Sequence, residues 1–518
     1  MHRHDWRHTM RLYYAANVAT LGFYAFGYHL GEFNNISTLL PCQDPNWPET
    51  APPAPYLGIP LPVCIPMSTV QFSFANAVFP LAGVLGALAG GPMAHSLGRI
   101  RAMMLFVLFL IVAPVVLALA SSYAWLLVGR SLAGIGSVGI TTVIPVYLSE
   151  ISPPPLRGRI GNISSVMINV GLAIAPLAGW YWADSAPAWR SIVGLSLPTS
   201  IAQLVGLFFC PESPTWLDIV GRRGEAEAIR HSLGHDVAHP VLDNVVDDGP
   251  SMSRPSLEDD LTAVATMDAK LEDASKLAAL DRLVPPSQQH QLDNGVAAAP
   301  SVESMSVLEF LRDPAYRSSL IILALAHSAQ QFSGNNTYFV YSFFILMLIM
   351  TPEHANLFYL IFAFGQIPIN YFPGLFIDRT GRRPLILGTM AVMAACAVLF
   401  TVSVAVHSPI MSIAMFIAAV SVCAVGLSNV PFILMAEVTD TRSVAAASTV
   451  SIVINTLSNF VVLFVFPLLL DSLHEYTFLL FAGYLAVSGL ALATVLPETL
   501  GRSNEEVMAE LKVGIRRA

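Results

Sequence analysis

The 518-residue chain contains little charge. Lys, Arg, Asp and Glu together make up 12% of it, whereas hydrophobic residues make up 54%, and the mean hydropathy is +0.62. Soluble proteins carry about 25% charged residues, so a set of soluble domains of this composition would have abnormally uncharged surfaces. The scarcity of charge excludes an ordinary soluble protein and favours a polytopic membrane protein.

Several chemical signatures are also missing. The sequence has no GxxxxGK[ST] phosphate-binding loop, no hydrolase triad and no cluster of residues spaced to bind a metal. It lacks a basic stripe of the kind that binds nucleic acid, and its formal net charge is −9. We therefore expect no enzyme activity, no ATP-driven pumping by this chain alone, no cofactor and no nucleic-acid partner.

What the chain has in abundance is long apolar segments. A helix needs about 20 mainly apolar residues to cross a bilayer, and the sequence offers twelve such segments, arranged as six, a long polar insert and six more. They lie near 12–33, 69–91, 102–120, 124–147, 160–182, 190–209, 317–346, 354–377, 385–406, 410–434, 444–469 and 476–496. The predicted fold is an all-α polytopic membrane protein with twelve transmembrane helices in two six-helix halves.

A short basic loop between apolar runs occurs twice, at residues 91–99 and 374–383. Such a repeat indicates duplicated membrane halves, which is how many transporters are built. We expect the first half over residues 12–209, with an external loop at 34–66, and the second half over residues 317–496. The remaining parts are an N-terminus (1–11), a linker (210–316) and a tail (497–518).

Basic residues fall almost entirely on one side of this topology. The positive-inside rule places that side in the cytosol, together with both termini and the insert. On the other side, only Arg130 and Arg190 lie at helix ends. No address signal is readable, so the plasma membrane and the vacuolar membrane remain alternatives.

The polar insert is predicted to mix short helices with linker. Residues 225–233 and 257–283 have helical spacing and composition. The segments around 247–250 and 285–289 are typical of disordered linker.

Two of the five cysteines, Cys42 and Cys64, share the long external loop. That compartment permits disulfides. Because the sequence does not report the distance between them, a bridge and two free thiols both remain open.

The densest group of polar residues inside a span is Gln-Gln-Phe-Ser-Gly-Asn-Asn at 330–336. Polar groups at membrane depth are costly and are functional candidates by default. Amide side chains offer donors and acceptors without charge, which suits a neutral polyhydroxylated ligand, and Gly334 allows the helix to break near the midplane. The alternative is hydrogen bonding between helices, but the amides lie on more than one helix face, so we favour a binding site.

The first span contains two titratable residues, His29 and Glu32, three positions apart on one helix face. Two such groups inside a membrane could relay a proton. We favour the simpler alternative, in which Glu32 lies near the external interface and His29 hydrogen-bonds a neighbour.

Charged residues gather at the cytosolic helix ends. We expect them to form salt bridges between the two halves that hold the outward-open state and break on inward opening. They are Arg99, Glu150, Arg157, Glu212, Arg222, Asp378, Arg382, Arg383, Glu437, Arg442 and Glu498.

An ordered set of motifs carries a resemblance to a known family. They are Gly129-Arg130, residues 145–150, Arg157-Gly158, residues 211–217, residues 330–336, residues 381–383 and residues 497–501. Together they resemble the sugar porter family of the major facilitator superfamily, from about residue 20 to 505 without most of the insert. The segment 26–34, with its histidine, resembles a fungal branch of which some members are linked to vacuolar protein sorting. The resemblance implies a twelve-helix carrier of hexoses or polyols that works by alternating access.

The resemblance also implies a set of ligand contacts. The positions that match sugar-binding residues of the family are Gln330, Gln331, Asn336 and Asn459. Four others depart from the family pattern, with Ser165 for a glutamine, Gln366 for an asparagine, and Phe432 and Thr456 for tryptophans. Losing a tryptophan removes aromatic contact area, and a polar site tuned to each hydroxyl discriminates strongly. These departures argue against glucose as the substrate more strongly than they argue against a carbohydrate or polyol in general.

Three functions remain open. We favour facilitated diffusion of a neutral hexose or polyol by a monomer in a lipid bilayer. The second is proton-coupled symport through His29 or Glu32, since symporters of the family place an aspartate where His29 stands. The third is a sensor or trafficking factor that has a transporter fold, does not transport and signals through its insert.

Overall fold

The computed structural model describes residues 3–34, 36–42, 52–153, 156–182, 188–234, 305–371, 380–440 and 442–515. The predicted helix at 257–283 and both linker segments lie outside these ranges. The described chain is almost entirely helical, apart from one antiparallel hairpin of β1 (Ala54–Tyr56) and β2 (Ile59–Leu61).

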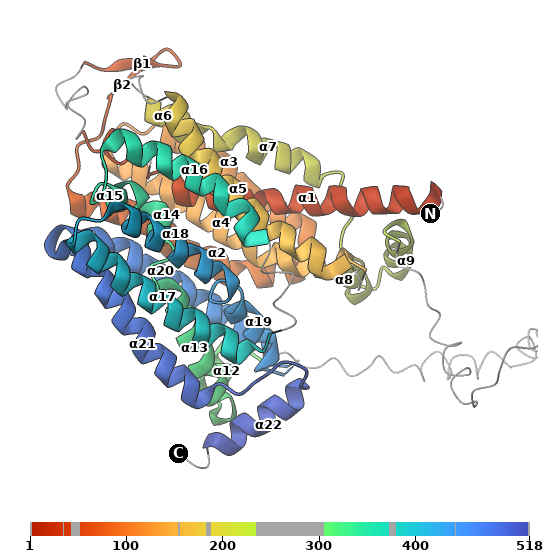
Figure 1. Cartoon of the computed structure of the whole chain (residues 1–518). Helices are drawn as coiled ribbons and strands as arrows, with labels where there is room; N and C mark the ends of the chain where they lie inside the picture. The colour runs from red at the N-terminus through yellow and green to blue at the C-terminus, as the bar shows by residue number, and fades with distance from the viewer. Residues whose placement is uncertain are drawn as a thin grey trace, which may run out of the picture. The chain divides into compact units, whose positions relative to one another are not determined.

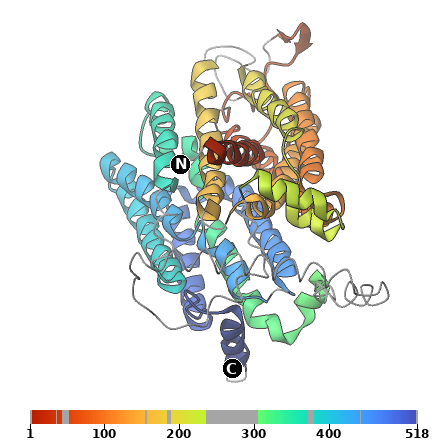
Figure 2. The ribbon, with the colours of Figure 1, turned by 90° about the vertical axis from the view of Figure 1, so that its right-hand side faces the viewer.

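The first six predicted spans coincide with helices, the sixth being broken at Leu195. They are α1 (Arg3–Gly31), α2 (Thr69–Leu97), α3 (Arg99–Ala118), α4 (Tyr123–Ile151), α5 (Arg157–Trp182), and α6 (Ala188–Gly194) with α7 (Ser196–Leu207). Two short helices follow, α8 (Pro214–Ile219) and α9 (Arg223–Ser232). In Figure 2, α1 is seen end-on among the helices of this half.

The second six spans also coincide with helices, and two of them are interrupted. They are α13 (Arg317–Phe332) with α14 (Thr337–Val340) and α15 (Ser342–Leu346), α16 (Pro352–Tyr371), α17 (Arg382–Ala405), α18 (Pro409–Val425) with α19 (Val430–Glu437), α20 (Val444–Leu473) and α21 (Thr477–Val495). A short helix precedes them, α12 (Val307–Arg312), and another follows, α22 (Asn504–Ile515).

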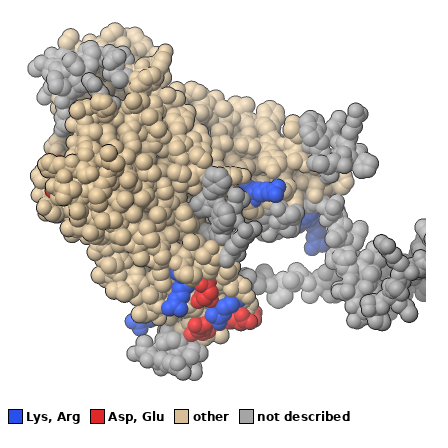
Figure 3. Space-filling model, in the orientation of Figure 1, with Lys and Arg blue, Asp and Glu red and all other residues tan. Residues whose placement is uncertain are grey.

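Among the described residues, seven helical stretches are long and apolar enough to cross a membrane. One of these stretches, Val444–Val495, includes both α20 and α21. The broad tan surface in Figure 3 shows how little charge covers the helices, whereas charged side chains gather over α12 and α22. An outer surface without charge suits contact with lipid tails.

Glycine allows the helices of the first half to approach closely. A Cβ atom on Gly134 of α4 would lie 2.0 Å from the carbonyl oxygen of Phe79 in α2. A Cβ atom on Gly27 of α1 would lie equally close, 2.0 Å, to the carbonyl oxygen of Ile168 in α5. Small residues at such crossings drive helix association in membranes, where lipid removes the usual hydrophobic force.

The two ends of the helix bundle differ in how the halves are joined. We call the end that carries β1 and β2 the hairpin side and the opposite end the termini side (Figure 1). On the hairpin side, one continuous apolar cluster contains buried residues of both halves, such as Phe33 and Phe466. On the termini side, the first half has its own cluster around Phe106, and the second half has another around Met390. The halves thus share a core on the hairpin side only, although α2 packs along α20 and α5 along α16.

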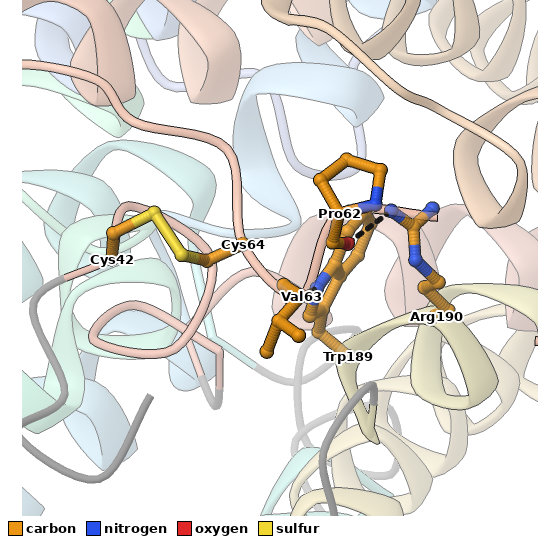
Figure 4. Close-up of a disulfide and its surroundings, with 6 residues drawn as sticks. All are labelled: Cys42, Pro62, Val63, Cys64, Trp189 and Arg190. Atoms are coloured by element: carbon orange, nitrogen blue, oxygen red, sulfur yellow. Dashed lines mark hydrogen bonds between the residues drawn. A yellow bond between two sulfur atoms is a disulfide. The ribbon is translucent and has the colours of Figure 1, made fainter. Parts of the chain in front are cut away.

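The loop between α1 and α2 is fastened at several points (Figure 4). Cys42 and Cys64 form a disulfide, with their Cα atoms 5.2 Å apart. Of the two alternatives that the sequence left open, a bridge or two free thiols, the structure has the bridge. The indole nitrogen of Trp189 in α6 donates to the carbonyl oxygen of Val63 over 2.7 Å, and Arg190 donates to that of Pro62 over 2.7 Å. Arg190 also donates to the carbonyl oxygen of Ala118, which ties the loop to the end of α3.

Removing the disulfide should destabilise the protein. The cysteines are 22 residues apart, and closing a loop of this size contributes about 3 kcal/mol in the chain-entropy account. We expect the double variant Cys42→Ser, Cys64→Ser to melt at a lower temperature than the wild type in detergent. Cys210→Ser, which changes a free cysteine, is the control, and equal melting of all three proteins would contradict the prediction.

Candidate functional site

Five amide side chains gather where α13 ends beside α20. We call Gln330, Gln331, Asn336, Asn455 and Asn459 the amide cluster. Asn455 donates to the Oε1 atom of Gln330 over 2.6 Å and accepts from the Nε2 atom of Gln331 over 2.9 Å. Asn336 donates to Gln331 over 2.8 Å and to Asn459 over 3.1 Å. The structure therefore brings together the four predicted residues and adds Asn455, which the sequence analysis missed although it lies one helical turn before Asn459.

Two helix interruptions position the amide cluster. Helix α13 stops before Gly334, whose φ of +79° lies in the left-handed region, and the chain turns so that Asn336 reaches back to Gln331. A second interruption, between α18 and α19, frees the carbonyl oxygen of Ser428, which accepts from the Nε2 atom of Gln330 over 2.9 Å. The expected break at Gly334 is thus present. A Cβ atom at this glycine would also lie 2.6 Å from the ring of Phe481, so a larger residue does not fit.

The amide cluster retains the capacity to bind a ligand. Gln330, Asn336 and Asn455 are partly exposed, whereas Gln331 and Asn459 are 7% and 5% exposed. An amide has two N–H donors and an oxygen with two lone pairs, so the bonds within the cluster use only part of the hydrogen-bonding capacity of its five amides. The free donors and acceptors carry no charge, which matches the hydroxyl groups of a neutral solute.

Two further predicted residues, Ser165 and Gln366, lie in a second group between α5 and α16. Asn169 donates to the carbonyl oxygen of Ser165 over 2.8 Å, and Asn370 donates to that of Gln366 over 2.9 Å. Asn370 also donates to the Oδ1 atom of Asn169 over 3.2 Å, which joins the halves. Neither asparagine was predicted. Each lies four positions after a predicted residue, on the same helix face, and that spacing was the signal that could have found them.

Phe432 and Thr456 do not take part in the amide cluster's hydrogen bonds. Phe432 is 44% exposed, and its ring meets that of His327 edge-on at 5.1 Å. The hydroxyl of Thr456 donates to Ile452 in its own helix over 2.7 Å. His327, which is fully buried, lies 3.4 Å from the Nδ2 atom of Asn455 and extends the polar region one turn along α13.

His29 and Glu32 form a buried group with Arg130 of α4. The Oε1 atom of Glu32 lies 3.0 Å from Arg130 Nη1 and 3.1 Å from His29 Nδ1. The Glu32 side chain is 0% exposed and that of Arg130 is 1% exposed. The expectation that His29 hydrogen-bonds a neighbour is confirmed, with Glu32 as that neighbour. Glu32 directly follows the end of α1 on the hairpin side, and its place near the external interface stays a prediction. Arg130 neutralises this carboxylate, which could not otherwise stay buried in charged form. The arginine, noticed in the sequence only as a motif residue, is its essential partner.

Next to this group, one side chain bridges the halves on the hairpin side. Asn34, beyond the end of α1, donates to the hydroxyl of Ser342 over 2.8 Å and accepts from the backbone N–H of Phe343 over 3.1 Å. Asn34 and Ser342 are 2% and 0% exposed. We call these contacts the Asn34 latch, because they hold the end of the first span against the interrupted seventh span.

The charges on the termini side pair within each half. In the first half, Arg99 binds Glu150 through two bonds of 2.8 and 2.7 Å. Glu212 accepts from the backbone N–H of Arg99 over 2.9 Å. This gives a partner to an N–H group in the first turn of α3, where the helix itself supplies none.

The second half repeats this arrangement. Arg382 lies 3.2 Å from Glu437, and Glu498 accepts from the backbone N–H of Arg382 over 2.8 Å. A Cβ atom on Gly98 or Gly381 would lie 2.5 or 2.3 Å from the capping carboxylate, which explains the glycine in both copies of the repeated loop.

The expected salt bridges between the halves are not formed among the described residues of this structure, in which the halves are joined on the hairpin side. The expectation concerned the outward-open state, so it stays a prediction. Arg222 pairs with Glu225 and Arg442 with Glu309, while Arg383 donates to the carbonyl oxygen of Ala493. In the part of the chain that the structure describes, every ion pair on this side lies within one half or its adjoining short helices. The physical reason is that a neighbouring helix start already satisfies each capping carboxylate. The side chain of Arg157 and all of Asp378 lie outside the described residues.

The two capping carboxylates differ electrostatically. Burial raises the pKa of Glu212 above its usual range, although backbone N–H groups of Ser213 and Arg99 lower it in part. Burial has the same effect at Glu498, but there hydrogen bonds from the backbone of Leu500 and Arg382 outweigh it and hold the pKa below the usual range. The pKa values at equivalent positions of the two halves are therefore shifted in opposite directions.

Comparison with known proteins gives consistent matches over nearly the whole chain. The family model described as "Sugar (and other) transporter" matches residues 15–254 and 266–511. The chain is 26% identical to facilitated glucose transporter member 2 of Sus scrofa, over 97% of this chain and 94% of the relative. It is 24% identical to vacuolar protein sorting-associated protein 73 of Saccharomyces cerevisiae, over 92% of this chain and 91% of the relative.

Among solved structures, the chain resembles the xylose transporter XylE from E. coli in a partially occluded inward-open conformation. The TM-score is 0.69 at 18% identity, covering 95% of this chain and 100% of that chain. At this identity the likeness concerns the fold alone. It confirms the predicted major facilitator fold with two six-helix halves.

The two capping glutamates should respond differently to removal of their charge. Gln resembles a protonated carboxyl, so Glu212→Gln should cost less stability at pH 7 than Glu498→Gln. The contribution of Glu498 is present above the ordinary glutamate pKa of about 4.3 and is lost as pH falls through its lower folded pKa. We therefore expect Glu498→Gln to melt several degrees below the wild type at pH 7 and to approach it in acid. A larger loss at pH 7 in Glu212→Gln would contradict this.

Proposed function

The chain belongs to the sugar (and other) transporter family, and from that premise we propose that it carries a neutral polyhydroxylated solute, a hexose or polyol, across a membrane by alternating access. The predicted resemblance to sugar porters, with its link to a fungal vacuolar protein sorting relative, is confirmed by the same matches. The single observation that supports the substrate class is the amide cluster, in which five uncharged amides converge from α13, the break after it and α20.

The chemistry of the amide cluster favours hydroxyl groups over ions. No charged side chain hydrogen-bonds to its five amides in the described residues. A solute with several hydroxyls can replace the bonds that the amides now make with one another, because each hydroxyl both donates and accepts. A solute that lacks one of these hydroxyls leaves a buried amide unpaired, which is the basis of discrimination at such sites.

The position of the amide cluster fits a carrier that opens to one side at a time. The halves share a core and the Asn34 latch on the hairpin side, and on the termini side each keeps a separate core. We propose that the hairpin side is external, because it carries the disulfide, and that both termini are cytosolic, as the basic residues indicate. The plasma membrane and the vacuolar membrane both fit this orientation.

Facilitated diffusion is the mode that we propose first. The ion pair of Glu32 with Arg130 is fully buried, which favours a fixed structural charge pair over a titrating relay. Proton coupling is the second candidate, and one observation favours it. His29 Nε2 and Glu32 Oε2 have no hydrogen-bond partner among the described residues. A proton on Glu32 would release Arg130 and loosen the contact between α1 and α4.

Uptake by proteoliposomes tests the substrate class. With a radiolabelled panel of hexoses and polyols, we expect downhill uptake of at least one member and a loss of about tenfold or more in Gln331→Ala, since removing one partner leaves buried amides unpaired. Asn17→Ala, which changes an exposed amide of α1, is the matched control. Equal uptake by Gln331→Ala would contradict the proposed site. No uptake of any member by folded protein would favour the sensor or trafficking role.

The coupling mode is tested with an imposed inward proton gradient. Facilitated diffusion predicts that the solute does not accumulate above its external concentration and that His29→Asn keeps wild-type downhill uptake. Accumulation that is driven by the gradient and abolished in Glu32→Gln would contradict facilitated diffusion and establish symport.

A further inference from the structure

A cavity separate from the amide cluster lies on the hairpin side, where the two halves meet. Its volume is about 140 Å³. The first half contributes the segment after α1 and the start of α2, and the second half contributes α15 and the end of α20. We propose that this cavity binds one small organic cation of the choline class, a methylated ammonium group that carries a hydroxyl.

Aromatic rings form much of the cavity wall. Phe72, Tyr341, Phe344 and Phe466 line it, and they contact one another, with ring centroids 5.6 Å apart for Tyr341 and Phe466 and 6.4 Å apart for Phe72 and Phe344. Tyr341 and Phe466 are almost completely buried, so they back the wall, and the ring surface open to a ligand is mainly that of Phe344, which is half-buried. The faces of such rings attract methylated ammonium groups, and aromatic cages are the usual way in which proteins recognise them.

A carboxylate supplies the charge that matches a cation. Asp471, the exposed acidic residue of the lining, makes no salt bridge in the described part of the chain. None of the residues that line the cavity is basic, and Arg130 of α4 is the cation that acts electrostatically on its lining residue Tyr341. Arg130 is already paired with Glu32, and the ring of Phe33 covers its guanidinium group at 4.3 Å. An ammonium group in the cavity would therefore be the counter-ion of Asp471.

The volume of the cavity and the hydroxyl groups in its wall restrict the choice of ligand further. A cavity of about 150 Å³ in another protein holds one benzene molecule, so this one accommodates a single small molecule. A disaccharide or a peptide would not fit. Two hydroxyl groups, those of Ser37 and Thr69, also line the cavity, and they offer partners for a hydroxyl at the other end of the ligand.

The bound cation should select one conformation. Both halves supply the lining, so the cavity exists only while the Asn34 latch holds them together on the hairpin side. A ligand that binds only one of two states shifts the population toward it. The cation would thereby slow a transport cycle that must separate the halves on this side. The binding itself does not depend on the proposed solute.

The test is choline binding to the purified full-length protein in nanodiscs, measured by calorimetry without any sugar. We expect saturable binding, with at least tenfold lower affinity in Asp471→Asn and in Phe344→Leu. Glu475→Gln removes a partly exposed acidic residue of the same side that does not line the cavity, and it should bind choline as the wild type does. The neutral analogue 3,3-dimethyl-1-butanol has the same shape and should bind at least tenfold more weakly.

Several results would overturn the proposal. They are no choline binding by folded wild-type protein, equal binding of the neutral analogue, and unchanged binding in Asp471→Asn. An equal loss in Glu475→Gln would assign the effect to general surface charge and would also overturn it. Because the readout needs no transport, these outcomes are independent of whether the chain carries a hexose or polyol.

Discussion

One buried guanidinium group holds the hairpin side of the first half together. Arg130 of α4 donates to the carboxylate of Glu32 and the carbonyl oxygen of His29 in α1, and to the carbonyl oxygen of Ala75 in α2. A buried arginine that loses its partner costs several kcal/mol, so these three helices must keep their ends together. This constraint fixes the end of α1, and with it Asn34, which joins the second half.

On the termini side, charged residues likewise pair within each half and leave the two halves unconnected by ion pairs in the described ranges. Each half satisfies its own arginines and carboxylates, as Arg99 does with Glu150 and Arg382 with Glu437. Within the described ranges, no ion pair on that side joins one half to the other, and the apolar cores there are distinct. The two halves are therefore internally tied units that share a core on the hairpin side, an arrangement that permits rigid-body rocking of one half against the other.

The local pattern of the sequence predicted the elements better than the contacts between them. Apolar length located all twelve spans, and the amides at 330–336 located the cluster, because both signals lie within one segment. Arg130 was missed as the partner of Glu32 because it comes from another helix, and which helix faces which depends on packing. Asn455 and Asn370 lie one turn from predicted residues of their own helices, and only their contacts with another helix depend on that packing. The charge pattern showed which side Glu212 lies on but not that a backbone N–H group at the start of α3 would donate to it. The expected bridges between the halves concern the outward-open state and stay a prediction.

We infer that the halves move as units, closing one side as the other opens. Spin-label distances test it most directly, with one pair across the termini side (Ser149→Cys and Ala436→Cys) and one across the hairpin side (Ser122→Cys and Ser472→Cys), all at exposed positions. We expect the transported solute to shorten the first distance while it lengthens the second. Two distances that stay fixed during transport, or that change in the same direction, would contradict it.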